Sequence, residues 1–329
     1  MAVASACEEL TVERMSTLLL FIDGIGVGRD DPETNPFAVP EIRRLAPLAG
    51  GPALGGASFR ALDATLGVPG LPQSATGQTT LFTGVNAAQA VGRHHPGLPG
   101  PTLQTILRDE SLFAKLVRAR ATPTFANAFT RRYLEAKRVR LGATTHMVMA
   151  SGVRLRLLED DDTTDATLSH DYTGTWMTAR GYPVKPRTAA DAGRVLSGLV
   201  GTHDLVLYEY FLTDLVAHRG TRDQRFEQAR LVEALVDAVL DSVDLSRDRV
   251  VIVSDHGNLE EADHDRHTLN PVPLLAWGHR SREFVHSVDA MDQLTPALVR
   301  GALKKEWEKD PRPNLGEKGE CPLFDGGVA

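Results

Sequence analysis

The sequence predicts an α/β fold, namely a three-layer α/β/α sandwich with a mainly parallel sheet and a small inserted cap. Two observations support this prediction. Short apolar runs of strand length alternate with helical patterns along the second half of the chain, which is typical of a parallel sheet with helices on both faces. Residues 131–187 differ in composition, with clustered basic residues followed by an acidic run, and are predicted to form the insert.

The first part of the core is predicted over residues 15–130. The apolar run at 17–22 has strand length and is closed by Asp23-Gly24-Ile25-Gly26. The elements that follow, in chain order, are a Pro- and Gly-rich stretch at 31–72, a turn opening into a short helix at 74–90, a helix at 103–118 and a strand at 122–129.

The second part of the core is predicted over residues 188–308. Its elements, in chain order, are a helix at 189–200, a strand at 204–210, a long amphipathic helix at 223–243, strands at 249–254 and 272–277, and a helix at 291–304. Residues 1–14 carry charges and no apolar signal region, so they are predicted to be a disordered leader. Residues 309–329, rich in Gly, Pro and charge, are predicted to be a poorly ordered tail.

Composition excludes several classes of protein. The 329 residues, 42% of them apolar, suffice for one large α/β domain or a core with a smaller insert. A net charge of −7 argues against a nucleic-acid binder, which needs a basic surface. Cys7 and Cys321 are the only cysteines, so the sequence predicts a reducing cytoplasmic location and no disulfide framework. No apolar stretch is long enough to span a bilayer, so no membrane partner is expected.

Acidic and imidazole side chains follow several of the predicted strands. They are Asp23, Asp214, His218, Asp255, His256 and His267. Residues that follow parallel strands gather at the carboxyl edge of the sheet. Asp214 and His218 are four residues apart, so one helical turn would point both the same way. Such oxygen and nitrogen ligands suit Mn²⁺ or Zn²⁺, with Mg²⁺ as a further option. The sequence therefore predicts a centre that binds two divalent metal ions.

A candidate nucleophile precedes the predicted short helix. Ser74 lies on a Gly-containing turn, Gln73-Ser74-Ala75-Thr76-Gly77-Gln78, where the amino end of a helix offers N–H groups and partial positive charge to a phosphate. A metal bound to the Ser74 oxygen would make it nucleophilic without a histidine base. The simpler alternative is that Ser74 only caps this helix. The predicted metal ligands favour the nucleophile.

These patterns occur together in a characteristic order. The motifs are Asp23-Gly-x-Gly, Ser74-x-x-Gly77, Asp214-x-x-x-His218, Asp255-His256-Gly257-Asn258 and His267-Thr268-x-x-x-Val272-Pro273. They resemble the alkaline phosphatase superfamily, most closely the branch that holds cofactor-independent phosphoglycerate mutase and phosphopentomutase. The resemblance implies an alkaline phosphatase-like core. It further implies that Asp214, His218 and His267 bind one metal, that Asp23, Ser74, Asp255 and His256 bind the other, and that Ser74 is transiently phosphorylated.

The resemblance also implies a function, namely phosphomutase-like, two-metal phosphoryl transfer through a phosphoserine on a small phosphorylated metabolite. The chain departs from the mutases at Gln78, where they have a histidine, and its stretch between Ser74 and Asp214 is much shorter than the long phosphoglycerate mutase insert. Two alternatives therefore stay open. One is a metal-dependent phosphomonoesterase or phosphodiesterase, and the other is a non-catalytic module that binds metal or phosphate.

Three residues near the nucleophile are candidates for binding the substrate: Arg93, Gln78 and Thr76. Arg93 could hold a phosphate through two parallel hydrogen bonds, although an exposed loop arginine is an equal alternative. Asn258 could support a metal ligand through a hydrogen bond, although a simple turn residue is an equal alternative. The sequence does not determine the oligomeric state.

Overall fold

A computed structural model describes residues 15–136, 140–159, 167–182 and 184–308. The predicted leader at 1–14 and tail at 309–329 lie outside the described residues. The centre of the fold is a six-stranded sheet in the order β2-β8-β7-β1-β6-β3. Its strands are β1 (Thr17–Ile22), β2 (Ser58–Leu62), β3 (Pro123–Phe125), β6 (Leu205–Tyr210), β7 (Arg249–Val253) and β8 (Val272–Gly278).

Four neighbouring strands of this sheet are parallel. β1 lies between β6 and β7 and pairs Leu19 with Leu207 on one side and with Val251 on the other. β3 is parallel to β6, whereas β8 is antiparallel to both β7 and β2. Because β8 runs back from the edge where β7 ends, both ends of the loop at 254–271 lie at the carboxyl edge of the parallel strands. The predicted mainly parallel sheet is confirmed.

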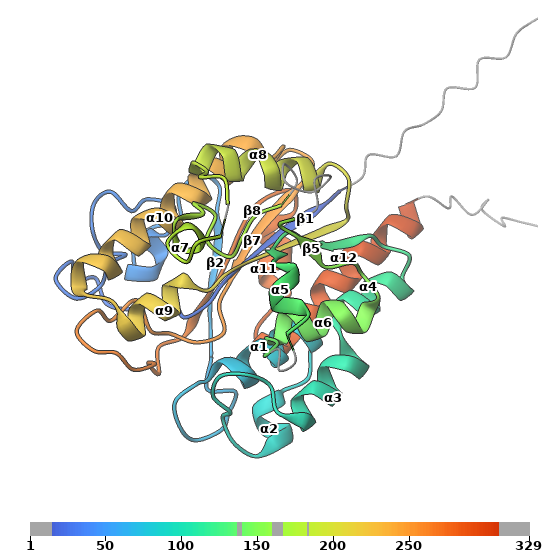
Figure 1. The fold of residues 1–329 in the computed structure, drawn as a ribbon, viewed down its shortest axis with the longest axis horizontal. Coiled ribbons are helices and arrows are strands. Elements are labelled where there is room, and N and C mark those ends of the chain that lie inside the picture. Colours follow the sequence, from blue (N-terminus) through green and yellow to red (C-terminus); the bar gives the residue numbers. More distant parts are fainter. Residues whose placement is uncertain (1–14, 137–139, 160–166, 183, 309–329) are drawn as a thin grey trace, which may run out of the picture.

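Helices cover both faces of the sheet (Figure 1). Every residue of β1 is buried, and successive side chains point to opposite faces. Leu18 and Leu20 join the apolar cluster of α8 (Ala189–Val200) and α10 (Arg222–Ser242), on one face. Leu19 and Phe21 join the cluster of α1 (Ser74–Thr83), α4 (Leu112–Arg118) and α12 (Leu294–Glu308), on the other. This arrangement explains the continuous apolar run of the strand and confirms the three-layer α/β/α sandwich.

The remaining helices are short. They are α2 (Ala87–Val91), α3 (Pro101–Glu110), α5 (Arg131–Leu134), α6 (Ala143–Ser151), α7 (Thr175–Thr178), α9 (Leu212–Arg219) and α11 (Ser281–His286), with 3₁₀ turns at Ala46–Ala49 and Met291–Gln293. None of the helices in the described part of the chain is both long and apolar enough to cross a membrane.

Some element boundaries differ from those predicted. The helix predicted at 103–118 is two helices, because Ser111 ends α3 and its hydroxyl accepts a hydrogen bond from Ala114 N at the start of α4. The strand predicted at 122–129 is divided between β3 and β4 (Ala128–Phe129), which pairs with β5 (Arg156–Leu157) outside the main sheet. β2 was not predicted, since this edge strand is only partly buried and lacks a continuous apolar run.

The predicted cap at 131–187 contains α5, α6, β5 and α7 in its described part. Met147 and Val148 of α6 belong to the same buried cluster as Leu107 of α3 and Leu112 of α4. Residues of α5, α6 and α7 also line a cavity at the carboxyl edge of the sheet. The boundaries between core and cap stay a prediction.

Candidate metal centre and nucleophile

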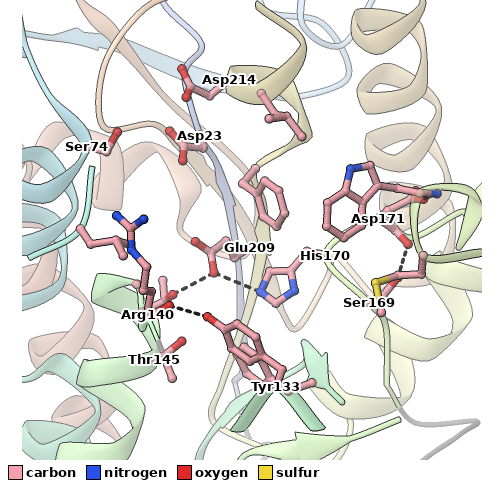
Figure 2. A pocket seen from close by; sticks show the side chains of 18 of the residues that line it. Asp23, Ser74, Tyr133, Arg140, Thr145, Ser169, His170, Asp171, Glu209 and Asp214 are labelled. Atoms are coloured by element: carbon pink, nitrogen blue, oxygen red, sulfur yellow. Dashed lines mark hydrogen bonds and ion pairs between the residues drawn. The ribbon is translucent and has the colours of Figure 1, made fainter. Parts of the chain in front are cut away.

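The six acidic and imidazole side chains among the seven predicted metal ligands meet at the carboxyl edge of the sheet. Asp23 directly follows β1, Asp214 and His218 lie on α9 after β6, and Asp255 and His256 follow β7. His267 lies in the loop between β7 and β8. Figure 2 shows Asp23 and Asp214 near Ser74, which begins α1. Residues more than 200 positions apart in the chain are thus brought together by the pairing of β1 with β6 and β7.

One group of ligand atoms comprises Asp23, Asp255 and His256, whose nearest donor atoms lie within 4.8 Å of one another. His256 Nε2 is 3.3 Å from Asp23 Oδ1 and 3.5 Å from Asp255 Oδ2. Gln78 Nε2 donates hydrogen bonds to Asp23 Oδ2 at 3.2 Å and Asp255 Oδ2 at 3.0 Å. Gln78 therefore orients two carboxylates of the site.

The second group surrounds Asp214. Asp214 Oδ1 lies 3.4 Å from His218 Nε2 and 3.6 Å from His267 Nε2. The ring of His256 stacks on that of His267, with centroids 3.7 Å apart, so the two groups adjoin. Two adjacent groups of oxygen and nitrogen donors are the arrangement that a two-metal site needs.

The orientation of two histidines is set by backbone carbonyls. His218 Nδ1 lies 2.7 Å from Asp265 O, and His267 Nδ1 lies 2.7 Å from Pro72 O. A carbonyl only accepts, so each Nδ1 carries the hydrogen and, in the neutral ring, each Nε2 presents a lone pair. These Nε2 atoms are 3.0 Å apart. Two facing lone pairs at this distance repel, so the pair fits a shared cation.

Burial makes the charges of this centre unfavourable without a counter-ion. Burial and the nearby carboxylates of Asp255 and Asp214 raise the pKa of Asp23 well above its usual value. Burial likewise raises the pKa of Asp255. Among the described residues, Asp23 Oδ1 has no hydrogen-bond partner. Burial, with the neighbouring His256, lowers the pKa of His267 to about 4, so this ligand stays neutral. Clustered carboxylates and neutral imidazoles fit divalent cations.

Ser74 faces this centre rather than capping α1. Gln73 is the N-cap residue, and Ser74 is the first residue of the helix. Ser74 Oγ lies 3.0 Å from His256 Nε2. Gly77 allows the close approach of α1, because a Cβ there would lie 2.6 Å from Asp255 O. Ser74 is thus not the N-cap residue of α1, and its role as the nucleophile stays a prediction.

Glu260 connects the segments that carry the ligands, and the sequence analysis missed it. Its side chain is buried, and its Oε2 accepts hydrogen bonds from Gly26 N and Asn258 N, at 2.8 Å each. Its Oε1 accepts hydrogen bonds from the side chains of Thr268 and Asn270. One carboxylate thus holds the segments after β1, after β7 and after His267. Only its place two residues after Asn258 could have indicated this role.

Asn258 has the supporting role that the sequence suggested. Its Nδ2 donates a 2.8 Å hydrogen bond to Asp214 Oδ1. This contact fixes the orientation of a predicted metal ligand.

Replacing Glu260 with Gln is expected to weaken metal binding about 10-fold. The NH₂ group of the new side chain is a donor, and it would have to face other donors, either the two backbone N–H groups or the side chain of Asn270. Two donors do not bond each other, so one connection between segments would be lost. The measurement is a titration of metal-free protein with Mn²⁺. Glu41→Gln is the control, because Glu41 is exposed and contacts Arg230 of α10. Equal metal affinity in both variants would contradict the role of Glu260.

The three predicted substrate-binding residues lie in different surroundings. Gln78 lines the cavity beside Ser74 but is bonded to Asp23 and Asp255. Thr76 is buried and bonds Gln73 O and His95 N. Arg93 is exposed, and neither it nor Thr76 lines the cavity. The structure thus brings only Gln78 to the candidate site.

The cavity beside the metal centre has a volume of about 560 Å³. Asp23, Ser74 and Asp214 form its edge nearest to the centre (Figure 2). Its walls include residues that no sequence motif indicated, among them Tyr133, Arg140, His170, Trp176 and Glu209. They come from the predicted cap and from β6.

The chain is similar to a known family and to known proteins over part of its length. The family described as the Metalloenzyme superfamily matches residues 179–302, which contain Asp214, His218, Asp255, His256 and His267. The 2,3-bisphosphoglycerate-independent phosphoglycerate mutase of Syntrophotalea carbinolica is 33% identical over 106 residues, 29% of this chain and 20% of that protein. The same enzyme of Hahella chejuensis is 28% identical over 147 residues, 41% of this chain and 27% of that protein. The matches thus span about a fifth to a quarter of these relatives.

Solved structures share the fold over most of the chain. The PH0037 protein from Pyrococcus horikoshii has a TM-score of 0.53 at 13% identity and covers 89% of this chain and 98% of its own. The alkaline phosphatase from the Antarctic bacterium TAB5 has a TM-score of 0.51 at 10% identity and covers 88% of this chain and 97% of its own. The alkaline phosphatase-like fold expected from the motifs is confirmed.

Proposed function

We propose that this chain, a metal-dependent enzyme with an alkaline phosphatase-like fold and a Metalloenzyme-superfamily segment, transfers the phosphoryl group of a small phosphorylated metabolite through Ser74. The observation that carries the proposal is the position of the Ser74 hydroxyl, 3.0 Å from His256 Nε2 and beside the other predicted ligands. A serine that serves only the helix would not need to face a cluster of acidic and imidazole groups.

The proposed roles of the residues are as follows. Asp214, His218 and His267 would hold one divalent cation, and Asp23, Ser74, Asp255 and His256 the other. When bound, the cations would lower the pKa of the Ser74 hydroxyl and neutralise charge on the phosphoryl oxygens. Ser74 Oγ would form a bond to phosphorus while the ester P–O bond of the substrate breaks. The proton of the Ser74 hydroxyl would pass to solvent, and the departing alcohol oxygen would take up a proton from water. The N–H groups at the start of α1 would stabilise the transferred group.

The phosphoserine would then be resolved by a second hydroxyl of the substrate, as in a phosphomutase. The curated relatives support this choice, since they are phosphoglycerate mutases. A metal-dependent phosphomonoesterase or phosphodiesterase, in which water resolves the phosphoserine, is the second candidate. Gln78 favours it, because the mutases that the motifs resemble have a histidine at this position, whereas the Gln78 amide donates hydrogen bonds to both carboxylates and does not titrate.

Mn²⁺-loaded protein incubated with a panel of sugar phosphates and phosphoglycerates is expected to bind two equivalents of metal and to form phosphoserine at residue 74. Mass spectrometry locates the phosphoserine, and metal analysis gives the stoichiometry. Isomer without free phosphate identifies a mutase, and free phosphate identifies a phosphatase. Fewer than two equivalents of metal, or no phosphoserine with any substrate, would overturn the proposal in favour of a non-catalytic binding module.

A further inference from the structure

A further acidic side chain, Glu209, lines the cavity below Asp23 and is not among the predicted metal ligands (Figure 2). Glu209 is on β6, and its side chain is 10% exposed. Asn127 holds the backbone on both sides: Glu209 N donates to Asn127 Oδ1 at 2.8 Å, and Asn127 Nδ2 donates to Glu209 O at 2.7 Å. Figure 2 shows the carboxylate below Asp23 and beside His170. A buried strand therefore fixes this charge within the cavity.

Only one oxygen of Glu209 is engaged by the described residues. Thr144 Oγ1 donates a 2.8 Å hydrogen bond to Oε2, and His170 Nε2 lies 3.5 Å from the same oxygen. Oε1 is left toward the cavity, which Glu209 lines. A carboxylate oxygen only accepts hydrogen bonds, so Oε1 suits a hydroxyl or amino group of a ligand.

Aromatic rings form a continuous wall next to Glu209. Phe129 stacks on Tyr133 with centroids 5.9 Å apart and meets His170 edge-on at 5.3 Å. Phe211 lies 5.3 Å from His170 and 6.0 Å from Trp176. All five side chains line the cavity. Such a wall offers ring faces and edges to a planar group.

The size of the cavity agrees with a ligand larger than a three-carbon acid. Its volume of about 560 Å³ lies within the range of about 300–1,000 Å³ typical of sites for drug-sized ligands. A phosphoglycerate bound at Ser74 would leave most of this volume, including the aromatic wall, without contact.

We infer that the substrate is a phosphomonoester whose alcohol part is planar and carries a hydrogen-bond donor, and that Glu209 determines this specificity. The phosphoryl group lies at Ser74, the planar part lies along the wall of Tyr133, Phe129, His170, Phe211 and Trp176, and the donor binds Glu209 Oε1. This inference rests on the proposed phosphoryl transfer at Ser74.

The test compares four probes on the metal-loaded protein: benzyl phosphate, hydroxybenzyl phosphate, aminobenzyl phosphate and glycerol phosphate. The release of the alcohol in the first turnover is measured, so that kcat/KM reports the formation of phosphoserine and does not depend on the hydroxyl that resolves it. Glu209→Gln is expected to lower kcat/KM about 10-fold for the hydroxybenzyl and aminobenzyl esters and to leave benzyl phosphate nearly unchanged. Phe129→Leu, which shortens the wall, is expected to lower kcat/KM for all three benzyl esters but not for glycerol phosphate. Glu227→Gln on the exposed face of α10 is the matched control.

The outcomes separate the two proposals. If wild-type protein forms phosphoserine with the probes but glycerol phosphate is the best substrate, the inferred specificity is wrong while phosphoryl transfer stands. An equal loss for benzyl and hydroxybenzyl phosphates in Glu209→Gln would also overturn the role of Glu209. If no probe or metabolite gives phosphoserine, the proposed function itself fails.

Discussion

Replacing Ser74 with Ala is expected to lower phosphoryl transfer by at least about 10³-fold, because the change removes the atom that would accept the phosphoryl group. The described hydrogen bond of the Ser74 hydroxyl is the one to His256, and Gln73 is the N-cap residue, so α1 should remain folded. The measurement is kcat with the best substrate of the panel, together with phosphoserine by mass spectrometry.

Ser246→Ala is the control for this variant. It removes an exposed hydroxyl that precedes β7, at the end of that strand opposite the metal centre. Full activity is expected in the control. Phosphoenzyme formation in Ser74→Ala at the wild-type level would show that another residue is the nucleophile.

Replacing Asp255 with Asn is expected to lower activity by at least about 10²-fold and the metal content from two equivalents to one, because a carboxylate ligand is lost. The same change should raise the melting temperature of the metal-free protein. Burial and the charges of Asp255 and Asp214 raise the pKa of Asp23. The folded state therefore binds the proton of the Asp23 carboxyl group more tightly than the unfolded state does. At neutral pH, where the carboxyl group of the unfolded chain is ionised, the raised pKa of Asp23 therefore destabilises the metal-free fold.

Thermal melting of both proteins, with chelator and with Mn²⁺, tests this prediction. At about pH 8 the histidines of the unfolded chain are neutral, as His267 is in the folded protein. The lowered pKa of His267 therefore does not affect the melting temperature at this pH. Metal should stabilise the wild type more than the variant, because it offsets the repulsion that the variant has already lost. A metal-free Asp255→Asn protein that melts below the metal-free wild type would contradict the account of repulsion between buried carboxylates.

The elements that the sequence predicted well are those whose pattern is local. β1 and α8 have the predicted bounds, because a strand covered on both faces is apolar throughout and a helix with one apolar face repeats with the helical period. α10 begins at Arg222, one residue before its predicted start, since Thr221 caps it through a capping box with Gln224. Errors occurred where burial is partial, as in β2, or where a single side chain interrupts a helix, as Ser111 does.

The sequence by itself determined which groups could bind metal, because Asp23, Asp214, His218, Asp255, His256 and His267 follow predicted strands and parallel strands share a carboxyl edge. Only the tertiary structure decided which groups support them. Glu260 joins three segments distant in the chain, and Glu209 reaches the cavity from a strand whose other residues are core. Their roles depend on contacts between distant segments and on burial. Neither leaves a periodic pattern in the chain.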